Sequence, residues 1–151
     1  MISRTAEYAL RAVLFLARQP EGAIVRAADI ADALRIPANY LSKILHILGR
    51  TDLLVSERGR RGGFQLARPA AEISLAEVIG PFDELEERGD CLLGRARCSE
   101  KDPCAAHTRW RAVHETVTSF FAETTVADLL EQPAASFEPA LSEGGADAGS
   151  T

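Results

Sequence analysis

The order of apolar periods in the first 67 residues constrains the fold more than any other feature. Apolar residues recur at helical spacing in three short stretches, about residues 6–17, 27–34 and 37–49. This spacing predicts three helices that each bury one face. Two short apolar runs follow, at 53–57 and 64–67, and a glycine- and arginine-rich segment, 58–63, separates them. Two such runs are typical of a β-hairpin, so the sequence predicts a mainly α fold: a winged helix-turn-helix with a small hairpin wing.

The second half of the chain carries further helix signals around a segment without any period. Ser74 and Glu77 have the spacing of a capping box, which predicts a short helix through Ile79. Residues 82–103 show neither a helical nor a strand period. A long helix is expected after them, from about Cys104 to Glu123, with five apolar residues along one side: Trp110, Val113, Val117, Phe120 and Phe121.

These signals divide the chain into three parts. We predict a winged helix-turn-helix domain over residues 1–80 and a loop with the long helix over 81–131, where Thr125 and Asp128 begin a last short helix. Residues 132–151 are dominated by Ala, Ser, Glu, Gly and Pro, which predicts a disordered tail.

The charge of the chain is distributed unevenly between its two halves. Residues 1–68 contain 11 Lys and Arg against 6 Asp and Glu, a net charge of +5, whereas residues 69–151 contain 6 against 16, a net charge of −10. A basic first half suits a polyanionic partner, and the acidic second half opposes non-specific binding. Two solvated faces without a partner are the alternative.

The third helix and the hairpin tip carry the candidate DNA-binding residues. In a winged helix-turn-helix the recognition helix enters the major groove, where Asn and Lys side chains can bind base edges. Arginines at a wing tip can reach phosphates or the minor groove. The candidates on the helix are Asn39, Tyr40, Ser42, Lys43, His46 and Arg50, and those on the wing are Arg58, Arg60 and Arg61. An ordinary solvated helix and turn are the alternative, but a basic tip has no packing role and favours the DNA-binding interpretation.

Three cysteines fall within 14 residues and form a candidate metal site. Cys91, Cys98 and Cys104 follow the pattern C-x6-C-x5-C, and His107 comes one helical turn after the last of them. Three thiolates and one imidazole complete a zinc site, and thiolates are the usual ligands of iron–sulfur clusters. A metal would also explain how a segment without a period is organised. A disulfide between Cys98 and Cys104 and three incidental cysteines are the alternatives.

Several function classes find no support in the sequence. No apolar run approaches the roughly 20 residues that span a bilayer, and Glu7 and Arg11 interrupt the first apolar stretch, so we expect a cytoplasmic protein with no membrane partner. Glu7 and Arg11 have the spacing of a helical ion pair. The chain shows no nucleophile elbow, no dinucleotide loop and no paired carboxylates, so we expect neither an enzyme nor a small-molecule substrate.

Several stretches between residues 4 and 129 resemble the Rrf-two (Rrf2) family of winged helix-turn-helix regulators, which includes IscR-like and NsrR-like members. The matching stretches are residues 4–12, 29–31, 39–41, 58–64, 73–79 and 125–129, together with the three cysteines. The resemblance implies a transcriptional regulator that senses redox state, iron–sulfur status or nitric oxide. It also implies a homodimer, joined through the long helix, that binds a palindromic operator in double-stranded DNA.

The same resemblance implies an iron–sulfur cluster held by the three cysteines. In IscR-like members a histidine is the fourth ligand of a two-iron cluster, and His107 matches its position, which favours a 2Fe–2S cluster. In NsrR-like members an acidic residue from the partner subunit's first helix is the fourth ligand of a 4Fe–4S cluster, and Glu7 matches that residue. A zinc-stabilised dimer without a sensing role is a third possibility. Pro37 and Ser42 differ from the IscR recognition helix, so the resemblance implies no particular operator.

Overall fold

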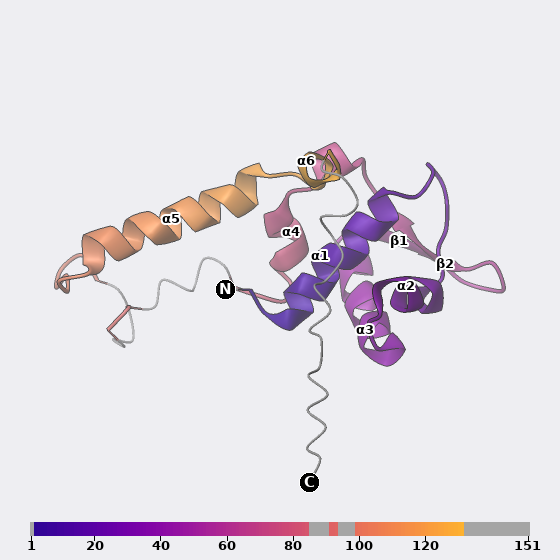
Figure 1. The fold of residues 1–151 in the computed structure, drawn as a ribbon, viewed down its shortest axis with the longest axis horizontal. Helices are drawn as coiled ribbons and strands as arrows, with labels where there is room; N and C mark the ends of the chain where they lie inside the picture. Colours follow the sequence, from indigo (N-terminus) through magenta and orange to yellow (C-terminus); the bar gives the residue numbers. More distant parts are fainter. Residues whose placement is uncertain (1, 85–90, 94–98, 132–151) are drawn as a thin grey trace, which may run out of the picture.

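Helices dominate the structure, a computed structural model that describes residues 2–84, 91–93 and 99–131 (Figure 1). The elements follow one another as α1 (Arg4–Ala17), α2 (Ala27–Leu34), α3 (Ala38–Gly49), β1 (Leu54–Glu57), β2 (Gly63–Leu66), the 3-10 helix η1 (Ala70–Glu72), α4 (Leu75–Ile79), α5 (His107–Glu123) and α6 (Val126–Leu130). The two strands pair antiparallel. The predicted mainly α fold with one small hairpin is therefore confirmed. The predicted tail, 132–151, lies outside the described residues.

The first three helices form where the sequence predicts them and enclose the core. The Ser3 hydroxyl caps α1 by accepting a hydrogen bond from the Ala6 amide at 3.1 Å. Helix α2 ends at Arg35, whose backbone is left-handed with φ of +53°. Helix α3 starts at Ala38, and Pro37 serves as its N-cap rather than as its first residue. Large side chains that are fully buried come from these helices and from the segments after them: Val13, Leu14, Ile30, Leu41, Ile44, Leu45, Leu48, Leu53, Ile73, Val78 and Ile79.

The hairpin is tied to the helices by a contact that the sequence does not predict. Val25, just before α2, forms an antiparallel bridge with Phe64 on β2, with N–O distances of 3.0 and 2.8 Å. The bridge brings the chains so close that a Cβ on Gly63 would lie 2.4 Å from the Val25 carbonyl oxygen. At the tip, Gly59 has a φ of +104°, which favours glycine. The wing is thus held against the helix-turn-helix by backbone contacts.

The last described helix packs against the first. The predicted capping box of Ser74 and Glu77 forms on α4. Thr125 and Asp128, the predicted start of the last short helix, form a second capping box on α6. Backbone hydrogen bonds from Leu75 to Thr124 and from Val126 to Ile73 join the segments that precede these helices. As a result α6 lies against α1 and η1. The chain therefore returns to the winged-helix body after α5, and the domain division at residue 80 stays a prediction.

Helix α5 projects from this body as an arm (Figure 1). It begins at His107 and not at Cys104, so the predicted start of the long helix is wrong by three residues. The reason lies in the preceding turn. The His107 amide donates an i→i−3 hydrogen bond to the Cys104 carbonyl at 3.0 Å, and the first i→i−4 hydrogen bond runs from the Trp110 amide to the Ala106 carbonyl. Seventeen residues make the arm about 26 Å long. Its N-terminal end is the end remote from the body.

Candidate DNA-binding and metal-binding sites

Four of the six candidates predicted on the third helix lie on the solvent side of α3 or at its C-cap, Arg50. Asn39, Lys43 and Arg50 are exposed and Ser42 is half-buried. The buried apolar stripe of α3 faces α1 and α2, so these polar residues lie on the side of α3 that faces solvent. Helix α3 follows α2 across a tight turn, and its solvated side is the surface that a recognition helix presents to a major groove.

The other two candidates on α3 make contacts with neighbouring elements. The Tyr40 hydroxyl forms a hydrogen bond with the Thr5 hydroxyl on α1, and the Tyr40 ring packs edge-on against Tyr8 at 5.8 Å between centroids. The His46 ring packs edge-on against Phe64 of the wing at 5.9 Å. Tyr40 and His46 therefore also position α3 relative to α1 and to the wing.

The wing tip is basic, and an arginine outside it braces its backbone. Arg58, Arg60 and Arg61 are all exposed. The guanidinium of Arg26, which precedes α2, donates a hydrogen bond to the Arg60 carbonyl. Sequence reasoning missed Arg26 because nothing in the local pattern indicates a contact with a residue 34 positions away. The one feature that could have drawn attention to Arg26 is its positive charge directly before the second helix.

The structure brings two of the three cysteines together. The Sγ atoms of Cys91 and Cys104 are 3.8 Å apart. A disulfide bond measures about 2.05 Å, so the two sulfurs are not bonded to one another. Cys91 is only 5% exposed, and Cys104 is half-buried. The two thiols face each other just before α5, at the far end of the arm.

The other described candidate ligands, His107 and Glu7, do not complete a metal site with this pair. Cys98 lies outside the described residues. His107 follows Cys104 by one turn, yet within the described parts of the chain no three His, Cys, Asp or Glu side chains form a group that could hold a metal ion. Glu7 on α1 lies beside Arg11, with 3.9 Å between the charged atoms, as the helical spacing predicts.

Arg111 on α5 anchors the segment that leads to Cys104. Its guanidinium forms ion pairs with Glu100 in that segment and with Glu115 one turn along α5, the latter at 2.8 Å. At the other end, the buried Asp83 carboxylate accepts a hydrogen bond from the Ser3 amide at 2.6 Å. Asp83 is thus attached to the start of α1, and Glu100 is attached to the arm.

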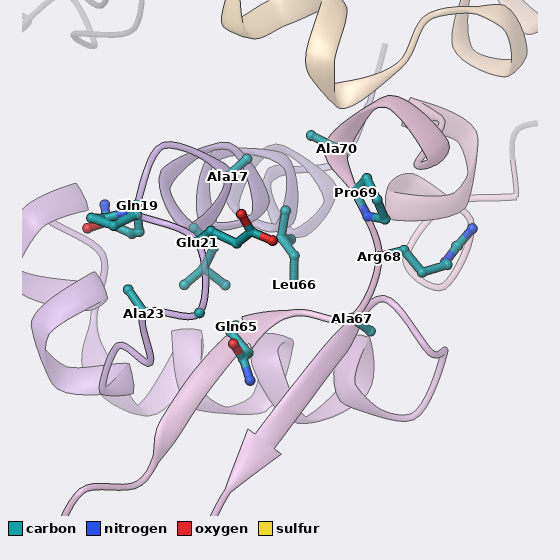
Figure 2. A pocket seen from close by; sticks show the side chains of 13 residues that line it. Ala17, Gln19, Glu21, Ala23, Gln65, Leu66, Ala67, Arg68, Pro69 and Ala70 are labelled. Atoms are coloured by element: carbon teal, nitrogen blue, oxygen red, sulfur yellow. The ribbon is translucent and has the colours of Figure 1, made fainter.

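A cavity of about 640 Å³ lies between the end of α1, the turn that follows it and the end of β2 (Figure 2). Its two charged lining residues are Glu21 and Arg68. Arg68 is already paired with Glu77 at 2.7 Å, and this hydrogen bond raises the pKa of Arg68 and lowers the pKa of Glu77. The one cation in the lining is therefore already paired within the chain.

A family model described as "Rrf2: Iron-dependent Transcriptional regulator" matches residues 2–132. The chain belongs to the Rrf2 family. It is 41% identical over 134 residues to an HTH-type transcriptional regulator of Mycobacterium tuberculosis, covering 85% of this chain and 80% of that protein. It is 31% identical over 129 residues to the regulator IscR of Cronobacter sakazakii, covering 85% and 79%.

Solved structures of Rrf2 regulators share the fold. T. potens IscR superposes with a TM-score of 0.72 at 21% identity, covering 92% of each chain, which shows the fold alone. The oxidized form of Staphylococcus aureus CymR superposes with a TM-score of 0.69 at 26% identity, covering 88% of this chain and 98% of that one. The Rrf2 chain is accordingly a helix-turn-helix transcriptional regulator that binds DNA, and its relatives are regulators rather than enzymes. In the described part of the chain, no helix combines the length and the apolar character needed to cross a bilayer.

Proposed function

We propose that this Rrf2 chain is an iron–sulfur-dependent transcriptional regulator of the cytoplasm, with its cluster at the far end of the α5 arm. The observation that carries the proposal is the 3.8 Å separation of the Cys91 and Cys104 sulfurs in a chain otherwise built as a DNA-binding domain. Its IscR relatives and a family model described as iron-dependent support the same cofactor. The coarser function, DNA-binding regulation, does not depend on the cluster.

The donor set fits an iron–sulfur cluster in its chemistry. Thiolates are the usual protein ligands of such clusters, and Cys91 and Cys104 already face each other. We propose Cys98 as the third ligand, and His107 or the partner subunit's Glu7 as the fourth. The cluster, when bound, would supply a group that oxidants or nitric oxide can alter or remove.

We propose that the arms of two chains pair in a homodimer. Val113 and Phe120 on α5 are 53% and 52% exposed, and Phe121 is the buried residue of this helix. An apolar helix face of this kind favours burial against a second helix. The α3 helices of such a dimer would bind two half-sites of a palindromic operator in successive major grooves.

The proposed role of the cysteine segment is to set the geometry of the dimer. The segment is anchored to α1 through Asp83 and to the arm through Arg111. Helix α1 in turn contacts the recognition helix through the hydrogen bond between Thr5 and Tyr40. A change at Cys91 and Cys104 can therefore shift the population between two dimer states, which needs only a few kcal/mol.

Anaerobic purification with iron, sulfide and zinc counts tests the proposal. We expect a coloured protein that contains iron and sulfide and that loses colour in air, together with a change of its affinity for operator DNA. The Cys91→Ser variant should be colourless, whereas a Ser99→Ala control in the same segment should keep the wild-type colour. A colourless wild-type protein that contains one zinc ion, or no metal, would overturn the cluster while leaving DNA binding intact.

Metal-free thiol sensing is a second candidate, favoured by the same pair of sulfurs. Two thiols 3.8 Å apart can close to a disulfide with a small movement, and one of the similar structures is CymR in its oxidized form. This candidate predicts a colourless protein in which an added oxidant forms an intramolecular Cys91–Cys104 bond. Mass mapping of the oxidized protein would identify that bond.

A further inference from the structure

We infer that Cys91 and Cys104 bind the same metal ion. The inference rests on the proposed metal site and deepens it, because it states how the ligands are divided among the metal ions. It also links the number of irons in the cluster to the separation of the two cysteine sulfurs.

The sulfur–sulfur distance carries the argument. Two thiolates that each bind one tetrahedral ion at about 2.3 Å lie about 3.8 Å apart. The Cys91 and Cys104 sulfurs are 3.8 Å apart. One ion can therefore replace the thiol protons without any change in the separation of the two sulfurs.

The geometry also distinguishes between the two kinds of cluster. In a two-iron cluster each tetrahedral iron takes two protein ligands, so two of its cysteines can share one iron. In a four-iron cluster each iron takes one protein ligand, and thiolates on different corners point away from each other. Cys91 and Cys104 would have to separate before they could serve a four-iron cluster, and the near-complete burial of Cys91 opposes such a movement.

Local contacts keep the two sulfurs in this arrangement. Cys104 is fixed by the turn in which its carbonyl accepts a hydrogen bond from the His107 amide at 3.0 Å. The segment before it is attached to α5 by the ion pair between Glu100 and Arg111. The sulfur of Cys104 is therefore positioned by the start of α5, and Cys91 lies against it.

Mössbauer spectroscopy of the iron-57-loaded full-length protein tests the inference. We expect about two irons per chain and two quadrupole doublets of equal area, one for each iron. Cys91→Ser and Cys104→Ser should shift the same doublet and leave the other unchanged. Four irons per chain, or two variants that shift different doublets, would overturn the inference while leaving the proposed iron–sulfur function in place.

Cobalt(II) titration of the metal-free protein keeps the inference testable where serine variants fail to hold a cluster. Two thiolates on one ion contribute to the same thiolate-to-cobalt charge-transfer band. Each single variant should lower the absorbance of this band, while the titration still ends at the wild-type number of cobalt ions per chain. A titration in which each single variant ends one cobalt ion earlier than the wild type would show that the two cysteines bind separate ions. A zinc-only wild-type protein would overturn the cluster, and the cobalt result would still decide whether the two cysteines share an ion.

Discussion

Helices α3 and α5 both carry an apolar stripe in the sequence, but only α3 buries its stripe within this chain. Leu41, Ile44, Leu45 and Leu48 of α3 lie in the core, whereas Phe121 is the buried residue of α5. Helix α3 is enclosed by α1, α2 and β1, whereas α5 packs mainly against α4. The apolar period of a helix thus predicts that one helix face will be buried. The fold decides whether residues of the same chain bury it.

The largest expected effect is in the core at α3, where a substitution that leaves a cavity should destabilise the winged-helix body. Leu45→Ala removes a fully buried side chain and should lower the free energy of unfolding by about 2–5 kcal/mol, measured by urea denaturation. The matched variant on the arm, Val113→Ala, should change it by less than about 0.5 kcal/mol at concentrations where the chain is monomeric. Equal losses would contradict the distinction between the two helices.

The contact between the wing and the body should be the next most sensitive. A Cβ on Gly63 would lie 2.4 Å from the Val25 carbonyl oxygen, so Gly63→Ala should cost about 1–3 kcal/mol and weaken DNA binding by displacing the wing. Gly49→Ala is the control, because no atom within 4 Å would meet its Cβ and alanine suits a helix. If Gly63→Ala and Gly49→Ala both melted at the wild-type temperature, the bridge between Val25 and Phe64 would not constrain the wing.

On the arm, the expected loss is in association rather than in folding. Phe120→Ala should weaken the proposed dimer at least about tenfold, or ~1.4 kcal/mol, because the ring packs edge-on against Phe121 and still leaves 52% of the residue exposed. Sedimentation equilibrium measures the change, with the exposed Ser119→Ala as its neighbour control. A dimer of unchanged affinity would place the interface elsewhere.

The smallest expected effect concerns the capping box of α4, Ser74 with Glu77, and the ion pair between Glu77 and Arg68. The hydrogen bond from Arg68 lowers the pKa of Glu77, and the Ser74 amide adds to this effect. A carboxyl whose pKa is depressed in the folded state stabilises the fold above its unfolded pKa, and this contribution is lost as the pH falls through the depressed value. Because the pair is exposed, Glu77→Gln should cost only about 0.3–1 kcal/mol at neutral pH.

A pH series checks the sign of this contribution. Thermal melts between neutral and acidic pH should show the wild-type advantage over Glu77→Gln shrinking as the pH falls. An advantage that grew towards acidic pH would contradict the lowered pKa.

The candidate sites were predictable from the sequence only in part. The polar side of α3 and the basic wing tip follow from the apolar period and the turn residues, so Asn39, Lys43 and Arg58 lie exposed as expected. The contact of Tyr40 with Thr5 was not predictable, because it joins residues 35 positions apart. The start of α5 was also missed, because the turn that delays it depends on the segment around Cys104 and not on the apolar period.

The sequence by itself determined the order of the α-helices, the hairpin and the capped starts of three helices, because periods and caps act between residues three or four positions apart. Ser3, Ser74 and Thr125 begin their helices as their local patterns predict. Only the tertiary structure decided that Val25 pairs with Phe64, that α6 returns to α1, and that the sulfurs of Cys91 and Cys104 meet at 3.8 Å. These contacts join distant positions, and their distances depend on how the whole body closes around its core.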